Sequence, residues 1–253
     1  MLRAIRRFVG AAVLLVLGFL GLLFVQALLA RRGDDPPFVN PSREPMRFGT
    51  DGAPQLRLVV IGDSTGAGQG APYAAGIAVH CARRLAGTGR RVSLVNRSVS
   101  GATTADVRRE QLEPAAALRP EVVLVAAGAN DVTSLRRTGA VKRDLRAIVR
   151  RLREASPDTR IVLTGSPDVG SSPRLAQPLR AVAGARTRQV NRVIRTLVAG
   201  ERLTFAPIAA RTGPQFRRDR TLFSPDRYHP DARGYATWRA PLDAALREVG
   251  YLP

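Results

Sequence analysis

The sequence contains very little cysteine, histidine or lysine. Cys81 is the single cysteine, so no disulfide can form within the chain and no cysteine cluster can bind a metal. The two histidines, His80 and His229, are too few for a histidine-rich metal site. We therefore expect neither a metal nor a cofactor.

Acidic residues are also scarce relative to basic ones, which leaves a formal net charge of +20. Lys142 is the only lysine, so almost all of the positive charge is carried by arginine. A strongly basic chain can bind nucleic acid, but these arginines are scattered through helix-like stretches and are not interleaved with aromatic residues. We expect no nucleic-acid partner, and a generally basic surface that could face anionic lipid or cell-wall polymer.

One long uncharged apolar run is present, residues 8–30, and arginines flank it on both sides. A membrane span needs about 20 apolar residues, whereas the apolar core of a cleavable signal has about 7–15. The sequence therefore predicts a short basic tail over 1–7 and a transmembrane signal-anchor over 8–30. Cleavage of this segment, with secretion of the rest, is the alternative. A lipoprotein anchor is excluded because no cysteine ends the run.

Basic residues are balanced across the run, so the positive-inside rule does not orient it. A short tail ahead of a large domain is the usual signal-anchor arrangement, and we expect a single-pass protein whose domain lies outside the cytoplasm. Residues 31–54 are rich in proline and glycine, which predicts an extended linker. The remaining residues, 55–253, are expected to form one monomeric domain.

Within that domain, apolar β-rich runs alternate with helical patterns. The expected strands are 56–61, 92–95, 122–126, 161–164 and 203–205, and the expected helices are 73–85, 104–118, 140–154, 186–198 and 235–249. This alternation predicts an α/β fold with a central parallel sheet and helices on both faces. Ligands of such folds bind beyond the carboxyl ends of the strands.

Three residues with possible roles in acyl transfer follow three different strands. Ser64, in the turn Gly62–Asp63–Ser64–Thr65, follows the first strand, Gly101 the second and Asn130 the third. A serine hydroxyl can act as a nucleophile, while a glycine amide and an asparagine side chain can donate to an oxyanion. Each also has an ordinary structural interpretation, as a βα turn, a turn glycine and a helix N-cap, respectively.

A base for the serine is found near the end of the chain. Asp226 and His229 are three residues apart between Pro225 and Pro230. That rigidity could let the carboxylate hold one imidazole nitrogen while the other faces Ser64. His80 lies in an apolar helical stretch and is interpreted as a packing or surface histidine. Nucleotide binding is not favoured, because the glycines after Ser64 lack GxGxxG spacing and no lysine follows them.

These four motifs, in this order, resemble the SGNH or GDSL-type hydrolase family, which is named for Ser, Gly, Asn and His in four blocks. The resemblance covers the chain from Leu56 onward, and Thr65 stands where the family name has leucine. It implies a flavodoxin-like three-layer α/β/α sandwich. The roles it implies are a catalytic triad of Ser64, Asp226 and His229, and an oxyanion hole formed by the Ser64 and Gly101 amides and the Asn130 side chain.

Residues 62–66 also match the GxSxG elbow of α/β-hydrolases. In that fold the elbow usually lies well inside the domain and the histidine far beyond its acid, so this competing interpretation is disfavoured.

The activity implied by the resemblance is hydrolysis of an ester through an acyl-serine intermediate. The substrate could be a small-molecule carboxylester, a lipid ester or an O-acetylated polysaccharide, because one fold hosts all of these activities. Residues 166–184, with Leu135 and Tyr228, are expected to shape the acyl pocket. A membrane-tethered binding module without turnover and an acyltransferase on the same fold remain the alternative functions.

Overall fold

The computed structural model describes residues 2–33, 36–198 and 203–252. Its centre is a six-stranded sheet in the order β1-β3-β2-β4-β5-β6. All neighbouring strands run parallel except β1, which pairs antiparallel with β3 at the edge. The strands are β1 (Met46–Phe48), β2 (Gln55–Gly62), β3 (Arg91–Asn96), β4 (Val122–Ala126), β5 (Arg160–Leu163) and β6 (Leu203–Phe205).

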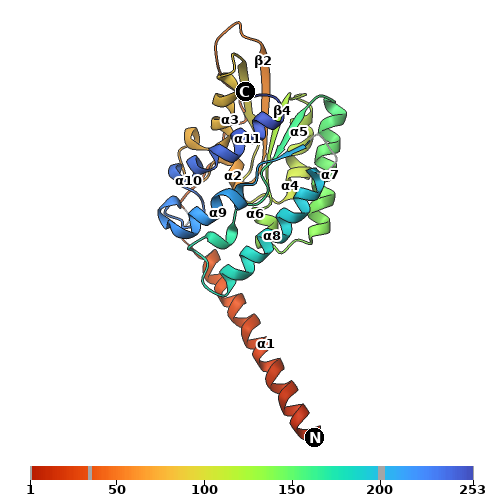
Figure 1. The fold of residues 1–253 in the computed structure, drawn as a ribbon, viewed down its shortest axis with the longest axis vertical. Coiled ribbons are helices and arrows are strands. Elements are labelled where there is room, and N and C mark those ends of the chain that lie inside the picture. The colour runs from red at the N-terminus through yellow and green to blue at the C-terminus, as the bar shows by residue number, and fades with distance from the viewer. Residues whose placement is uncertain (1, 34–35, 199–202, 253) are drawn as a thin grey trace.

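Helices cover both faces of this sheet (Figure 1). The longer ones in the domain are α3 (Ile77–Ala86), α7 (Thr138–Ala155), α8 (Leu179–Val198), α9 (Ile208–Arg218) and α11 (Arg239–Glu248). The shorter ones are α2 (Ser64–Ala67), α4 (Thr104–Asp106), α5 (Leu112–Ala116), α6 (Ala129–Thr133) and α10 (Ala232–Thr237).

The hydrophobic core is divided by the sheet into two clusters, because successive side chains of a strand point to opposite faces. In β2, Val59 and Ile61 belong to the cluster covered by α7 and α8, while Leu58 and Val60 belong to the one covered by α3, α9 and α11. Strands buried on both faces are typical of parallel sheets. The chain is therefore a three-layer α/β/α sandwich, and the predicted fold class is confirmed.

One strand and one of the longer helices were not predicted. Strand β1 lies within the segment expected to be a linker, so part of residues 31–54 belongs to the sheet. Helix α9 contains Gly213 and Pro214, two residues that disfavour helix interiors and that hid its periodicity. Helix α8 also begins at Leu179, earlier than the expected 186, and a π-helical turn at Val107–Gln111 interrupts the helix expected over 104–118.

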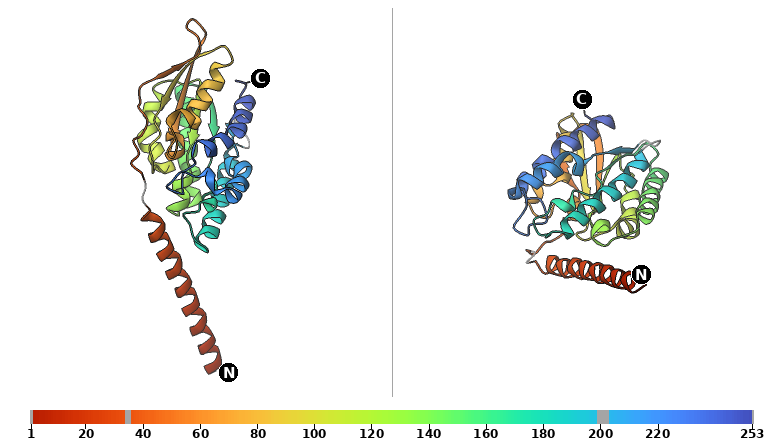
Figure 2. Two further views of the ribbon diagram at one scale, coloured as in Figure 1. Left: turned by 90° about the vertical axis from the view of Figure 1, so that its left-hand side faces the viewer. Right: turned by 60° about the horizontal axis from the view of Figure 1, so that its bottom comes forward.

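The N-terminal helix α1 (Leu2–Arg31) projects away from the domain (Figures 1 and 2). Its part from Ile5 to Arg31 is long and apolar enough to cross a membrane by length and composition, a test that a signal sequence also passes. The helix begins at Leu2, so the residues expected to form a separate tail are part of it. The last turns of α1 contact the start of α8.

Candidate active site

Ser64 begins helix α2, directly after β2, in a turn that the surrounding structure holds closely. Gly62 has a φ of +152°, and a side chain there would place its Cβ 2.0 Å from the Ala126 carbonyl oxygen on β4. The buried Gln111 side chain accepts from the Gly62 amide at 2.7 Å and donates to its carbonyl at 2.9 Å. This contact comes from the π-helical turn, a feature often found at functional sites. The turn that presents Ser64 is therefore rigid.

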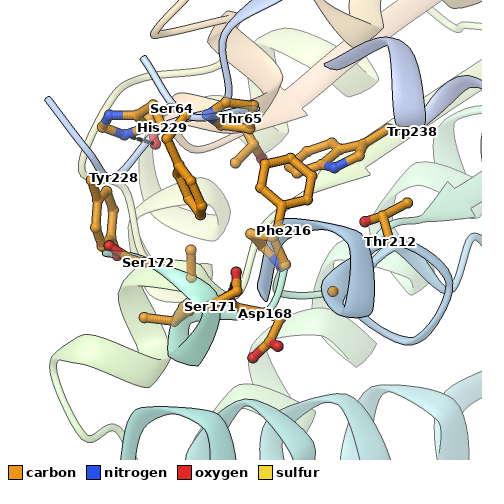
Figure 3. Close-up of a pocket in the computed structure, with 16 residues that line it drawn as sticks. Ser64, Thr65, Asp168, Ser171, Ser172, Thr212, Phe216, Tyr228, His229 and Trp238 are labelled. Carbon is orange, nitrogen blue, oxygen red and sulfur yellow. Dashed lines mark hydrogen bonds between the residues drawn. The ribbon is translucent and has the colours of Figure 1, made fainter. Parts of the chain in front are cut away.

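Ser64, His229 and Asp226 form a continuous hydrogen-bonded chain. His229 Nε2 lies 3.0 Å from Ser64 Oγ (Figure 3). On the other side of the ring, His229 Nδ1 lies 2.7 Å from Asp226 Oδ2. All three residues are buried, with exposed fractions of 5–9%. The structure thus brings together the three residues expected to act as nucleophile, base and orienting acid.

The second carboxylate oxygen of Asp226 is also fully engaged. It accepts hydrogen bonds from the Ser224 hydroxyl and from the Tyr228 and His229 amides, at 2.7–2.8 Å. Burial by itself would raise the pKa of Asp226, but these bonds and the one to the imidazole lower it below its ordinary value. Asp226 therefore stays ionised beside the imidazole. Ser224 was not anticipated from the sequence, because its role depends on a contact within one tight loop.

The loop that carries His229 is fixed by contacts from outside it. Arg227 adopts a φ of +60°, a conformation that a non-glycine residue rarely takes. Its carbonyl accepts from the Ser172 hydroxyl at 2.8 Å and from the Arg174 amide at 3.3 Å. Gly70 closes the other side, where a Cβ would lie 2.8 Å from His229 Cβ and 2.4 Å from the Pro230 carbonyl oxygen. Only glycine allows this close approach.

Gly101 and Asn130 lie beyond the ends of β3 and β4, as predicted. Asn130 does not cap a helix, because Gly128 occupies the N-cap position of α6. Its side-chain nitrogen donates to the Ala102 carbonyl at 3.1 Å, which brings it beside Gly101. Among the residues that the structure describes, the backbone amides of Ser64 and Gly101 donate to no other group. These three donors are free or easily freed to bind a ligand oxygen.

Asp131 has a structural role. Its carboxylate accepts from the Thr104 amide at 3.0 Å and from the Thr104 hydroxyl at 2.7 Å, and it pairs with Arg136. Thr104 begins the helix after Gly101, and Thr103 and Asp106 form a capping box there. Asp131 therefore ties the Gly101 segment to the Asn130 segment.

A small, mainly apolar pocket lies beside Ser64 and His229 (Figure 3). Pro167 to Ser172 form one wall, and Tyr228 lies at the His229 end, as expected for residues that shape an acyl pocket. Leu135 does not line it. Helix α9 and the C-terminal segments also line the pocket, which the sequence did not predict. Their lining residues are Thr212, Gly213, Phe216, Phe223, Pro230 and Trp238.

His80 is remote from this chemistry. It lies on α3 and pairs with Asp243 of α11 at 2.8 Å, as expected for a packing histidine. Within residues 2–33, 36–198 and 203–252, no three His, Cys, Asp or Glu side chains are grouped so that they could hold a metal.

Asp63, which precedes Ser64, is a fully buried carboxyl group whose pKa is raised. Its Oδ1 accepts from the Thr65 amide at 2.9 Å and from the Thr65 hydroxyl at 2.7 Å, while its buried Oδ2 has no partner among the described residues. Burial raises the pKa of Asp63 from 3.8 to about 6, and the bonds from Thr65 only partly oppose this. The pKa of this carboxyl group is thus higher in the folded protein than in the unfolded chain. Its contribution to the stability of the fold is therefore fully present below pH 3.8 and is lost as the pH rises through about 6.

We therefore expect the Asp63→Asn variant to gain stability relative to the parent as the pH rises. The difference in unfolding free energy between them should shift by up to about 3 kcal/mol between pH 4 and pH 8, because asparagine does not titrate. Denaturant unfolding across this range, followed by the fluorescence of the single tryptophan, Trp238, measures it. Parallel pH profiles for the two proteins would contradict the assignment.

Comparison with known proteins agrees with this geometry. The model of the GDSL-like lipase/acylhydrolase family matches residues 60–237. A GDSL-like esterase of Mycobacterium tuberculosis is 33% identical over 249 residues, covering 92% of this chain and 78% of that protein. Solved structures that share the fold include phospholipase A1 from Streptomyces albidoflavus NA297, with a TM-score of 0.54 and 21% identity; the match covers 75% of this chain and 99% of that one. They also include a catalytic mutant of an acetylxylan esterase from Geobacillus stearothermophilus, with a TM-score of 0.56 and 20% identity; here the match covers 82% of this chain and 99% of that one. This chain belongs to the GDSL-like lipase/acylhydrolase family and is an ester-hydrolysing enzyme of the SGNH type.

Proposed function

We propose that the protein cleaves its ester substrate through an acyl-serine intermediate formed on Ser64. The observation that carries this proposal is the hydrogen-bonded chain from Ser64 Oγ through the His229 imidazole to the Asp226 carboxylate. With Asp226 ionised, Nδ1 of the imidazole carries the proton of that hydrogen bond and Nε2 is free to accept the serine proton. His229 is therefore poised as a general base.

In the first half-reaction, Ser64 Oγ attacks the acyl carbonyl carbon while its proton passes to His229 Nε2. The tetrahedral oxyanion accepts hydrogen bonds from the Ser64 and Gly101 amides and from Asn130 Nδ2. Collapse breaks the bond between the carbonyl carbon and the alkoxy oxygen, and the imidazolium gives its proton to the departing alcohol. In the second half-reaction His229 deprotonates water, which attacks the acyl carbon and releases the acid and Ser64.

The two structural relatives act, by their names, on a phospholipid and on an acetylated xylan, so the shared fold does not select a substrate. The apolar pocket supports binding of the acyl part of an ester. We further propose that α1 is a single-pass anchor which holds a monomeric catalytic domain outside the cytoplasm. The uncharged run over residues 8–30 and the absence of buried residues in its apolar window support this.

Reaction with a fluorophosphonate probe tests whether Ser64 is an activated nucleophile. The probe should add one phosphonyl group to the protein with loss of fluoride, and the Ser64→Ala variant should not react. Ser171→Ala is the matched control, because Ser171 lines the same pocket but donates its hydroxyl to the Asp168 carbonyl. Intact-mass measurement reads the result. An unreactive but folded parent protein would favour a binding module without turnover.

Removal of the Asn130 side chain tests the oxyanion donors. The Asn130→Ala variant should lose about 10²–10³-fold in kcat towards a soluble aryl ester, with a small change in KM, because its donor acts mainly on the transition state. Thr133→Ala on the same helix removes an exposed hydroxyl and should keep the parental rate. Equal rates for both variants would exclude Asn130 from the reaction.

The close contact at Gly70 gives a separate test of how His229 is positioned. The Gly70→Ala variant should lower kcat by about 10²-fold, because the added methyl group pushes the His229 segment away from Ser64. Gly89→Ala is the matched control, since Gly89 has a similar positive φ of +78° but open space around its Cβ position. Steady-state kinetics and melting temperatures of both variants separate backbone strain from the displacement of His229. Equal losses in both would contradict this explanation.

A further inference from the structure

Helix α1 is joined to the loop that forms one wall of the pocket. The Gln26 side chain of α1 donates to the Gln177 carbonyl at 2.6 Å and accepts from the Leu179 amide at 3.1 Å. Arg174 donates to the Ala30 carbonyl at 2.5 Å, and Ala30 packs against the core. The end of α1 is thus held against the domain by polar contacts on both of its last turns.

The same loop contacts the segment that carries His229. Arg227 donates to the Pro173 carbonyl at 3.0 Å, in addition to the two bonds that its own carbonyl accepts. Residues 172–179 therefore contact α1 on one side and the Arg227–His229 turn on the other. In Figure 1, α2 and α6, which follow β2 and β4, lie towards the end of the domain from which α1 leaves. The carboxyl edge of the sheet and the apolar helix share one end of the molecule.

The level of the bilayer follows from the length of the apolar run. About 20 residues cross the hydrocarbon core, so a span that begins at Phe8 ends near Ala27. Gln26, the single polar side chain between Phe8 and Ala30, then lies where hydrocarbon gives way to headgroups. Its partners Gln177 and Leu179 must lie at the same level. Residues 172–179, which directly follow the pocket wall, would therefore rest at the membrane surface.

Exposed apolar side chains are found at this end of the domain. Leu135 and Val182 are 68% and 37% exposed, and apart from α1 the large exposed apolar residues in the described ranges otherwise lie between residues 39 and 46. The two belong to adjoining segments, because Arg186, one helical turn after Val182, donates to the Arg136 carbonyl. Side chains of this kind are suited to insertion between lipid headgroups.

Unpaired positive charge surrounds the same loop. Arg180 follows Leu179, and burial together with the nearby charges of Arg220, Arg217 and Arg227 lowers the pKa of its guanidinium. Arg217 pairs with Asp168, whereas Arg180, Arg220 and Arg227 form no ion pair with any carboxylate in the described part of the chain. Such a cluster is complementary to anionic headgroups. Each arginine near an anionic membrane surface contributes about 1 kcal/mol to the free energy of binding to that surface.

We propose that this end of the domain, hereafter the bilayer face (Leu135, Arg180, Val182, Arg220 and Arg227), docks onto the surface of an anionic lipid bilayer that α1 spans. The docking holds the pocket at the headgroup level, so that the enzyme takes ester groups presented at the membrane surface. This inference rests on the proposed anchor and on the proposed esterase function. It adds that the domain is held at the bilayer surface and does not move freely on a flexible tether.

Quenching by spin-labelled lipid tests the docking directly. The full chain is reconstituted into phosphatidylcholine vesicles, with or without phosphatidylglycerol, after a fluorophore is attached to Leu135→Cys. Cys81 is buried and does not compete for the label. Asp51→Cys is the matched control, because Asp51 is exposed in the turn that precedes β2, at the opposite edge of the sheet. We expect quenching at position 135 that increases with phosphatidylglycerol, and none at position 51.

Two variants test which contacts produce the docking. Arg180→Gln combined with Arg220→Gln should remove the response to phosphatidylglycerol and lower hydrolysis of a fluorogenic lipid ester in the vesicles by about tenfold. Gln26→Leu keeps α1 apolar but removes both bonds to residues 177 and 179, and it should also reduce quenching at position 135. Both should leave turnover of a soluble aryl ester at the parental value, since neither change touches the Ser64–His229–Asp226 chain.

The outcomes separate this inference from the proposed function. Absence of quenching at position 135, in protein that floats with the vesicles and hydrolyses the soluble ester, would overturn the docking and leave the esterase function standing. Quenching without turnover of either ester would support the docking and count against the function. Equal quenching at positions 135 and 51 would overturn the orientation proposed for the domain.

Discussion

The hydrogen bond between Ser64 and His229 joins two segments that lie 165 residues apart in the chain, and much of the surrounding structure is arranged around it. Ser64 is held by the turn after β2, where Gln111 bonds both the amide and the carbonyl of Gly62. His229 is held by the Asp226 carboxylate and by the close approach of Gly70. Because each partner sits on a rigid segment, little reorganisation is needed when a substrate arrives, which is how preorganised sites lower barriers.

The pKa values of two carboxyl groups near this pair are shifted in opposite directions by their environments. Asp226 accepts four hydrogen bonds, which lower its pKa in spite of burial. Asp63 is fully buried with one oxygen unpartnered, which raises its pKa to about 6. Only Asp226 therefore keeps its negative charge in mildly acidic solution. This division supports Asp226 as the group that orients the imidazole and Asp63 as a structural residue that caps α2.

The N-terminal helix is connected to the rest of the molecule through a short path. From α1, the contacts run through Gln26 and Arg174 to residues 172–179, and from there to Arg227 beside His229. Relatives with the same sandwich are named for esters as different as those of phospholipids and acetylxylan. The residues that give such proteins different substrates must therefore lie in the loops at the carboxyl edge of the sheet. In this chain the exposed apolar residues and the arginines of the bilayer face lie in such loops and at the start of α8.

The sequence alone was sufficient to predict the fold class, all five parallel strands and the four motifs. The strands could be predicted because each buried strand requires a local apolar run. The motifs could be placed together because a parallel sheet gathers its strand ends at one edge. It did not reveal α9, where Gly213 and Pro214 mask the helical pattern, or β1, a three-residue strand in a proline-rich segment. The roles of Gln111, Gly70 and Ser224, and the aromatic side of the pocket, were also decided only by tertiary structure. Each of these depends on how distant or tightly turned segments pack together, and no local periodicity encodes such contacts.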